Sequence, residues 1–359
     1  MKQPGLGIAA TVLVMALALG FVSLFSFPMF AGWVAFFLLC VIPIQIVMAV
    51  TWGTAQPAFA AAPPQPIRGL LLTIVSLVIG AVVTYAVIAI AGAGLTPPPP
   101  IVAHWVIVSV PVMFWAAIMF AGWPFTKIVK NPIAAGLVML VAVYIVNGVL
   151  FRIFFNYEFM QGAPVYVASL DPHGMFNGWS ALVFYVTALA GMFLMICFDL
   201  WPLTTVGAIM QQPVLGIVWT ACTLVFGAAL FYLGVNVLHM DVVRFLVRVP
   251  VPLIFGSIIV LNMLQNSLFA SMKQPVKGIA NVVAVVIIGQ VLSRAYGALA
   301  PTISGPLAAG PPAYDLEIWM ASALLSVTFP FLIYFAEFFK YWPLAPSTTA
   351  PEARAAAGR

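Results

Sequence analysis

Ten continuous apolar runs, each about as long as a membrane span, constrain this chain more than any other feature. One of them, residues 70–92, reads LLLTIVSLVIGAVVTYAVIAIAG and carries no charge. Roughly 20 apolar residues in a helix cross a bilayer, and continuous runs exclude a barrel, whose strands alternate apolar with polar residues. Only 6% of the residues are charged, against about 25% in soluble domains. The sequence therefore predicts an all-α, polytopic membrane protein.

The runs predict ten transmembrane helices joined by short loops. Their expected bounds are 6–27, 29–52, 67–93, 101–124, 133–155, 178–201, 214–238, 243–269, 276–299 and 316–342. They form a single transmembrane domain, residues 1–344. A tail of small and polar residues follows, 345–359, and its composition predicts disorder.

A short motif, Gln-Pro-x-x-Gly, begins four of the odd-numbered runs. It reads QPGLG, QPIRG, QPVLG and QPVKG, and a related KNPIAAG begins the fifth run. Proline suits the first turn of a helix, and glycine allows a neighbouring helix to approach closely. Three even-numbered runs end in Trp-Pro, within GWPF, LWPL and YWPL. The two signatures predict a repeated unit that consists of one helix out and one helix back.

The repeat predicts five helical hairpins with the same orientation, at approximately 1–60, 61–127, 128–207, 208–270 and 271–344. Like units with one repeated contact tend to close into a ring; the other interpretation is an old duplication whose products pack irregularly. In a ring, one helix of each hairpin would line the axis and the other would face lipid. The span count is similar to that of the tellurite-resistance and plant slow-anion-channel family, whose ten helices form a quasi-fivefold ring. None of that family's sequence motifs is present.

The basic residues predict the orientation of the chain. Nine of the 13 fall on the side that carries both termini, namely Lys2, Arg68, Lys127, Lys130, Lys273, Lys277, Lys340, Arg354 and Arg359. Because basic loops face the cytoplasm, we expect a multi-pass protein of the cell (inner) membrane with both termini cytoplasmic. The excess of basic residues on the cytoplasmic side then accounts for the formal charge of +5. The lipid bilayer is the expected partner, and no nucleic-acid partner is expected.

Two acidic residues near the cytoplasmic ends of predicted spans are candidates for proton or cation binding. An ionisable group at membrane depth is a functional candidate by default. Lys340 can pair with Glu337 three residues earlier, whereas no basic residue is near Asp199 in the sequence. Asp199 is therefore the stronger candidate, unless it lies at the headgroup level and is merely hydrated.

Polar amides and two arginines complete the transport candidates. Asn262, Gln265 and Asn266 lie together in NMLQN, where they either fasten helices together or line a water path. Arg152 and Arg294 occupy equivalent positions in the fifth and ninth spans. Near the external boundary they either snorkel to water or form a basic vestibule.

The sequence favours transport over catalysis. It has no GxSxG, no P-loop and no paired-histidine metal motif, and its three cysteines lie inside apolar runs. We expect no metal and no cofactor. The leading hypothesis is a channel or carrier for a small solute, with or without ion coupling. The alternative is a non-catalytic subunit of a membrane complex, with a homo-oligomer or a second membrane subunit as partner, and an enzyme has least support.

Overall fold

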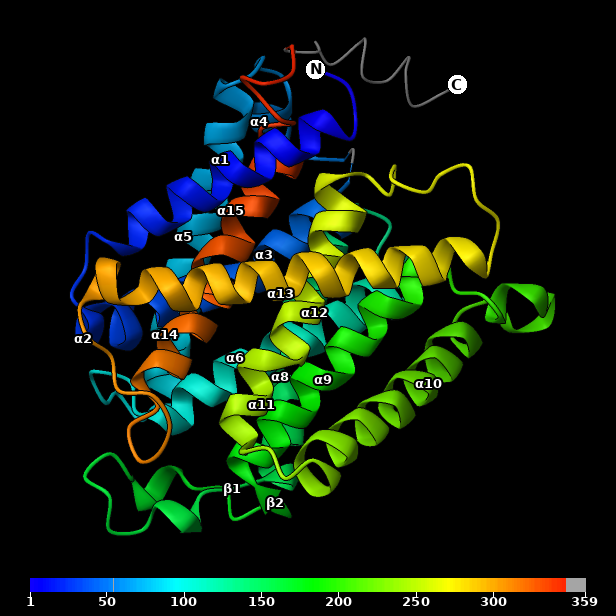
Figure 1. Ribbon diagram of the computed structural model, residues 1–359. Helices are drawn as coiled ribbons and strands as arrows, with labels where there is room; N and C mark the ends of the chain where they lie inside the picture. The colour runs from blue at the N-terminus through cyan, green and yellow to red at the C-terminus, as the bar shows by residue number, and fades with distance from the viewer. Residues whose placement is uncertain (54, 347–359) are drawn as a thin grey trace.

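The computed structural model of the protein describes residues 1–53 and 55–346 (Figure 1). In the described part, ten helices are long and apolar enough to cross a membrane, numbered here as spans 1 to 10 in chain order. They are Gly5–Val22, Phe27–Thr51, Ile67–Ile90, Pro100–Met119, Pro132–Phe154, Gly178–Cys197, Val214–Val237, Val242–Met263, Val276–Ser304 and Asp315–Phe338. The prediction of an all-helical multi-pass protein is confirmed. Of the expected disordered tail, residues 347–359 lie outside the described residues.

Each span contains one or two of the helices labelled in Figure 1. Spans 1, 3, 5, 6 and 9 are α1 (Gly5–Val22), α5 (Ile67–Ile90), α8 (Pro132–Phe154), α9 (Gly178–Cys197) and α13 (Val276–Ser304). The other spans also include π-helical turns. Their α-helical parts are α2 (Phe27–Met29) and α3 (Ala35–Ile46) in span 2, α6 (Pro100–Phe114) in span 4, α10 (Val214–Phe231) in span 7, α11 (Val242–Arg248) and α12 (Pro250–Ile258) in span 8, and α14 (Asp315–Ser322) and α15 (Phe329–Ile333) in span 10. Short helices α4 (Ala58–Ala61) and α7 (Phe125–Ile128) lie in loops.

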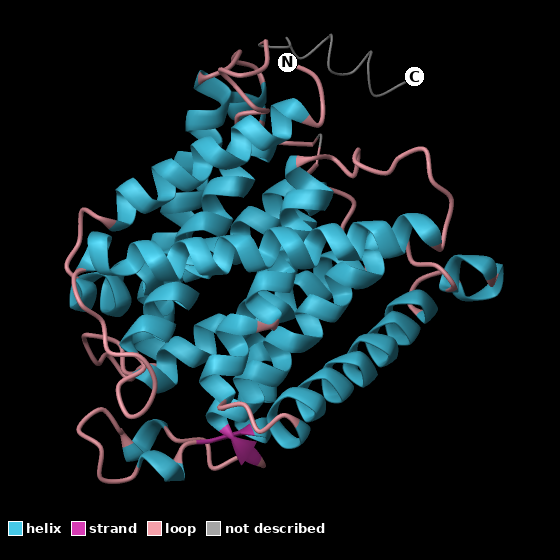
Figure 2. Cartoon of the chain, viewed as in Figure 1, coloured by secondary structure: helices cyan, strands magenta, loops and turns pink. Residues whose placement is uncertain are grey.

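Two short strands lie in the longest loop, between spans 5 and 6. β1 (Phe155–Asn156) pairs in parallel with β2 (Phe176–Asn177). Figure 2 shows them at the end of the bundle opposite to the one where α1 begins. We call the end where α1 begins the α1 end, and the end that carries the two strands the opposite end.

Burial divides the spans into two layers. In the even-numbered spans, 61% to 72% of the most apolar 18-residue stretch is buried, against 22% to 39% in the odd-numbered spans. A helix that is apolar all round yet largely exposed must face lipid. The even spans therefore form an inner layer and the odd spans an outer layer.

The inner layer closes on itself. Span 2 packs against span 4, span 4 against 6, span 6 against 8, span 8 against 10, and span 10 against 2. Each outer span packs against the inner span that precedes it in the chain, and span 1 packs against span 10. The first helix of the chain thus completes the outer layer against the last one.

Four inner spans end earlier than the sequence suggested. The expected ends were 124, 201, 269 and 342, whereas the helices end at Met119, Cys197, Met263 and Phe338. The chain then enters the left-handed region, at Ala121, Asp199, Gln265 and Lys340, with φ of +49° to +51°. A left-handed residue terminates a helix, so the Trp-Pro pairs lie in a turn beyond the helix. Span 9, in contrast, extends five residues past its expected end at 299, to Ser304.

The glutamine of the Gln-Pro-x-x-Gly motif joins two helices. Gln65 Nε2 donates to the carbonyl oxygen of Phe338 at 2.7 Å, and Gln65 Oε1 accepts from the backbone N–H of Gly69 at 3.2 Å. One side chain therefore caps the start of an outer span and the end of an inner span, where helices leave unpaired backbone groups.

The same pair of hydrogen bonds recurs at two further motifs. Gln3 donates to Met263 O at 3.1 Å and Gln212 to Met119 O at 2.8 Å, and each accepts from the N–H of the motif glycine. Gln274 accepts in the same way but donates to Asp199 Oδ2 at 2.9 Å.

The motif glycine permits this approach. A Cβ atom on Gly69 would lie 2.6 Å from the Phe339 ring, and one on Gly216 would lie 2.5 Å from the Phe120 ring. Any side chain there would push the outer span away from the inner one. The motif thus specifies a tertiary contact as well as the start of a helix.

Candidate functional site

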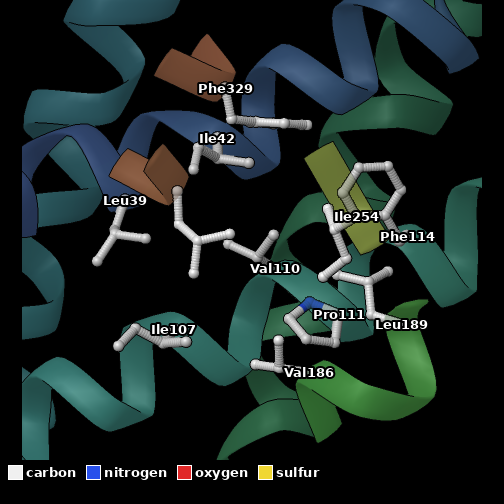
Figure 3. A pocket seen from close by; sticks show the side chains of 11 residues that line it. Leu39, Ile42, Ile107, Val110, Pro111, Phe114, Val186, Leu189, Ile254 and Phe329 are labelled. Carbon is white, nitrogen blue, oxygen red and sulfur yellow. The ribbon is translucent and has the colours of Figure 1, made fainter. Parts of the chain in front are cut away.

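A small apolar cavity lies where the five inner spans meet. Its volume is about 30 Å³, room for no more than a few water-sized molecules. Every lining residue belongs to an inner span and is apolar (Figure 3): Leu39, Ile42, Ile107, Val110, Pro111, Phe114, Val186, Leu189, Ile254, Leu325 and Phe329. Side chains therefore close the axis of the inner layer at this level.

The cavity lies near the middle of the membrane. Ile42, Val110, Ile254 and Phe329 each stand eleven positions before the left-handed residue that follows their span (53 − 42, 121 − 110, 265 − 254 and 340 − 329). Eleven helical residues rise about 16 Å, and the hydrocarbon core of a bilayer is about 30 Å thick.

Aromatic contacts close the axis around this cavity. We call this stretch, formed by the residues that line the cavity, the constriction. The rings of Phe114 and Phe329 meet edge-to-face with centroids 5.9 Å apart, and Phe114 meets Phe193 in the same way at 5.2 Å. A bare ion here would lose its hydration without any replacement ligand, at a cost of tens of kcal/mol. In this conformation the constriction is a barrier to ions.

A polar cluster joins two inner spans at the α1 end. The Glu337 carboxylate, near the end of span 10, accepts from Asn262 Nδ2 of span 8 at 3.0 Å and from Lys340 Nζ at 2.9 Å. Tyr341 donates its hydroxyl to Asn262 O at 2.8 Å. The structure thus brings together Glu337 and Asn262, which are 75 positions apart, and the expected pairing of Glu337 with Lys340 is observed.

The polar cluster borders a pocket of about 580 Å³. Its lining residues are Leu6, Leu261, Asn262, Gln265, Ala336, Glu337, Lys340, Tyr341, Ala345 and Pro346. Asn262 Oδ1 is buried and finds no hydrogen-bond partner among the described residues. The pocket therefore offers a carboxylate, an ammonium group and amides to a small polar molecule at the end of the inner layer.

Asp199 lies in a different setting from the one expected. It follows the end of span 6 and was expected about one turn inside it. Although no basic residue is near it in sequence, its carboxylate pairs with Lys277 Nζ of span 9 at 2.8 Å and accepts from Gln274 Nε2 at 2.9 Å. Its side chain is 48% exposed.

The partners of Asp199 keep its carboxylate ionised. Partial desolvation raises its pKa, but the hydrogen bonds from Lys277 and Gln274 outweigh this effect, so the pKa lies below its ordinary value. Asp199 is thus a half-exposed carboxylate in an ion pair between spans 6 and 9, whereas Glu337 lines a pocket at the end of the inner layer.

Asn266 fastens helices together. Asn281 of span 9 donates from Nδ2 to Asn266 Oδ1 at 3.0 Å and to Cys197 O at 3.2 Å. These bonds join the end of span 6, the turn after span 8 and the outer span 9, which favours the fastening interpretation for this amide.

Arg152 and Arg294 lie on outer spans 5 and 9. Both are exposed, and neither lines the axial cavity or the pocket at the α1 end. The amides that precede them are the docking groups: Asn147 donates to Trp105 O at 2.9 Å and Gln290 to Arg248 O at 2.8 Å. The structure does not bring the two arginines to the axis.

Two buried acids at the opposite end were missed by the sequence analysis. The Asp171 carboxylate, in a segment that reads as a simple turn, accepts from the N–H of Tyr157 and of His173 and from the Tyr166 hydroxyl. Tyr157 in turn meets His104 Nδ1 at 2.9 Å. This network anchors the long loop to the start of span 4.

Glu317 is the second buried acid. It is 6% exposed, accepts from the N–H of Gly310, and lies 3.6 Å from Arg244 Nε of span 8. Asp241, three positions before Arg244, caps α11 and accepts from the Tyr314 hydroxyl at 2.7 Å. Spans 8 and 10 are thus joined by polar contacts at both ends.

Comparison with protein-family models, curated proteins and solved structures finds no match to this chain. The likeness to the tellurite-resistance and slow-anion-channel family therefore stays an expectation from the span count. Among the described residues, no group of three or more histidine, cysteine, aspartate or glutamate side chains is arranged to hold a metal ion.

Proposed function

We propose that the protein is a channel or carrier for a small solute that crosses the membrane along the axis of five like-oriented helical hairpins. The observation that carries the proposal is the meeting of the five inner spans, one from each hairpin, at the apolar constriction half-way across. The charged side chains of the inner spans, Arg244, Arg248, Asp315, Glu317 and Glu337, lie toward the two ends and leave the middle of the axis uncharged.

The motif contacts support equivalent hairpins. With the hairpins numbered in chain order, each motif glutamine reaches the inner span three hairpins further round a ring of five: first to fourth (Gln3), second to fifth (Gln65), fourth to second (Gln212) and fifth to third (Gln274). One constant offset is what a closed ring of like-oriented units gives. The basic loops would place the α1 end in the cytoplasm.

The constriction is the proposed gate. Hydrophobic constrictions stop flow because water and ions leave them, and a small widening rewets them. Four of the five inner spans carry a proline within or just before their central turns, namely Pro43, Pro111, Pro252 and Pro330. Proline removes a helix hydrogen bond, so these turns are the places where the inner spans can bend apart.

A proton or ion coupled to transport would bind at Glu337. This carboxylate borders the pocket at the end of the inner spans, beside Asn262 and Lys340. With the carrier reconstituted in liposomes, Glu337→Gln should abolish uptake driven by a pH gradient and leave exchange without a gradient intact. If gradient-driven uptake survives in Glu337→Gln, coupling through this residue is excluded.

A polar substitution at the constriction tests the path itself. Ile254→Ser should wet the constriction and raise the flux of small solutes through proteoliposomes at least several-fold. Ile145→Ser on the lipid-facing side of span 5, where Ile145 is 64% exposed, is the matched control and should leave the flux unchanged. Equal fluxes in two folded variants would mean that the solute does not cross here.

The alternative is a non-catalytic subunit of a membrane complex. The closed apolar axis favours it, because such a core also suits a purely structural bundle. Purification in mild detergent should then yield a second membrane chain at fixed stoichiometry, and Ile254→Ser should create no flux.

A further inference from the structure

A groove lies outside the inner layer and is larger than both the axial cavity and the pocket at the α1 end. It has a volume of about 740 Å³ and lies between outer spans 1 and 3, with inner spans 2 and 10 as its floor. Its volume falls within the range of roughly 300–1,000 Å³ typical of ligand sites. None of its fifteen lining residues is charged.

The middle of the groove lies at hydrocarbon depth, and its ends reach Phe25, in the loop after span 1, and Phe339, just past span 10. On span 3 it extends from Thr73 to Thr84, which are six residues from the two ends of Ile67–Ile90. The eleven helical steps from Thr73 to Thr84 cover about 16 Å in the middle of a span that crosses a core of about 30 Å. What fills the groove in a membrane is therefore drawn from the bilayer interior.

The polar atoms of the groove are already used. Thr73 and Thr84 donate their hydroxyls to the carbonyl oxygens of Gly69 and Gly80, both at 2.8 Å, and the Tyr334 hydroxyl is 3.0 Å from Ser76 Oγ. Apart from the Trp33 indole, these hydroxyls are the polar side-chain groups of the lining. A sterol, a quinone or a headgroup would bring polar atoms for which this lining offers few partners.

The walls are aromatic. Phe21 of span 1 meets Phe25 with ring centroids 5.2 Å apart and Phe331 of span 10 at 5.5 Å. These ring contacts form part of the wall on either side of the boundary between spans 1 and 10.

We propose that this groove is a binding site for the hydrocarbon tail of a bilayer phospholipid. Leu38 and Phe331 line the groove, whereas Leu39 and Phe329, on the same two inner spans, line the axial cavity. A bound tail therefore packs against the spans that close the axis, and its presence fixes their separation.

The test is photo-crosslinking in vesicles of phosphatidylcholine that contain a small fraction of phosphatidylcholine with a diazirine midway along one acyl chain. Peptide mapping after illumination should find adducts at Phe21, Leu77 and Phe331 in several-fold excess over Val141 and Ile145, which are lipid-facing positions of span 5. Equal labelling of both groups would overturn the proposal.

A filled groove gives a second measurement. Leu77→Trp should remove the excess labelling at Phe21 and Phe331, whereas Leu137→Trp on span 5 should not. If a second copy of the chain fills the groove instead, labelling at Phe21 should fall as the protein-to-lipid ratio rises, and this result would also overturn the proposal. The crosslinking map of the wild-type protein tests the proposal even if Leu77→Trp does not fold.

Discussion

The glutamine of the repeated motif makes two hydrogen bonds that the backbone alone cannot. Its amide carries an NH2 group that donates and an oxygen that accepts, at the same distance from the chain, so it can pair with an N–H at a helix start and a carbonyl at a helix end at once. A motif that is read in sequence as a helix start is, in the fold, also the link between an outer span and an inner span.

At the residue scale, Gln212→Ala should lower the stability of the bundle by about 1–3 kcal/mol, because both Met119 O and the Gly216 N–H lose their partner. The exposed neighbour Gln211 supplies the control, Gln211→Ala. In detergent, Gln212→Ala should have a lower melting temperature than the wild type. Gln211→Ala should have the same melting temperature as the wild type. Equal melting temperatures would show that the motif glutamine does not fasten the helices.

A second residue-scale prediction concerns close helix packing. A Cβ on Gly289 of span 9 would collide with the backbone carbonyl oxygen of Pro252 in span 8, and backbone cannot move aside as a side chain can. Gly289→Ala should destabilise the protein by about 1–3 kcal/mol. Gly20→Ala in α1, where a Cβ meets nothing within 4 Å, should be neutral or slightly stabilising. A melting temperature of Gly289→Ala at or above the wild-type value would contradict the packing.

At the element scale, spans 6 and 9 are joined by the Asp199–Lys277 ion pair and the Asn281 hydrogen bonds. Polar ties of this kind also join spans 8 and 10 at both ends. Because apolar surfaces gain little from leaving lipid, such hydrogen bonds and close packing decide which helices associate.

The ion pair gives a pH dependence with a definite sign. The pKa of Asp199 is lower in the folded state than its ordinary value, so its stabilisation is complete above the ordinary pKa and is lost as the pH falls through the folded pKa. For a half-exposed pair it is at most about 1 kcal/mol. The melting temperature of the wild type should exceed that of Asp199→Asn at pH 7, and the gap should narrow below about pH 4. If the difference in melting temperature between the wild type and Asp199→Asn stays constant from pH 7 to pH 3, the Asp199–Lys277 ion pair is not the cause of that difference.

At the scale of the whole molecule, the inner spans form a closed layer and the outer spans cover it, with span 1 against span 10. Because the five inner spans pack in a closed cycle, the apolar constriction between them is lined by all five. The five-hairpin proposal adds that every unit enters the membrane the same way up.

Single cysteines test that orientation, after Cys40, Cys197 and Cys222 have been replaced. In intact cells, an impermeant maleimide should fail to label cysteine at Lys2, Lys130 or Lys273 and should label cysteine at Gln161 or Ala308, all of which are exposed. Permeabilised cells should allow labelling at all five. Labelling of positions 2 and 273 from opposite sides of the membrane would end the like-oriented hairpin proposal.

The sequence by itself determined the class of the protein, the ten spans and the approximate start of each, because apolar runs and proline-marked helix starts are local signals. It also pointed to Glu337 and Asn262, since polar groups at membrane depth are rare. It placed the ends of the inner spans several residues too late, because the left-handed turns at Ala121, Asp199, Gln265 and Lys340 carry no glycine at those positions to announce them.

Only the tertiary structure decided which residues meet. Lys277 pairs with Asp199 across 78 positions, and Asn262 meets Glu337 across 75; no periodicity in a chain reports such distant pairs. The choice of inner and outer spans was hidden for a related reason. All ten helices are apolar on every side, so composition does not distinguish a face buried against protein from a face exposed to lipid, and only packing separates the two.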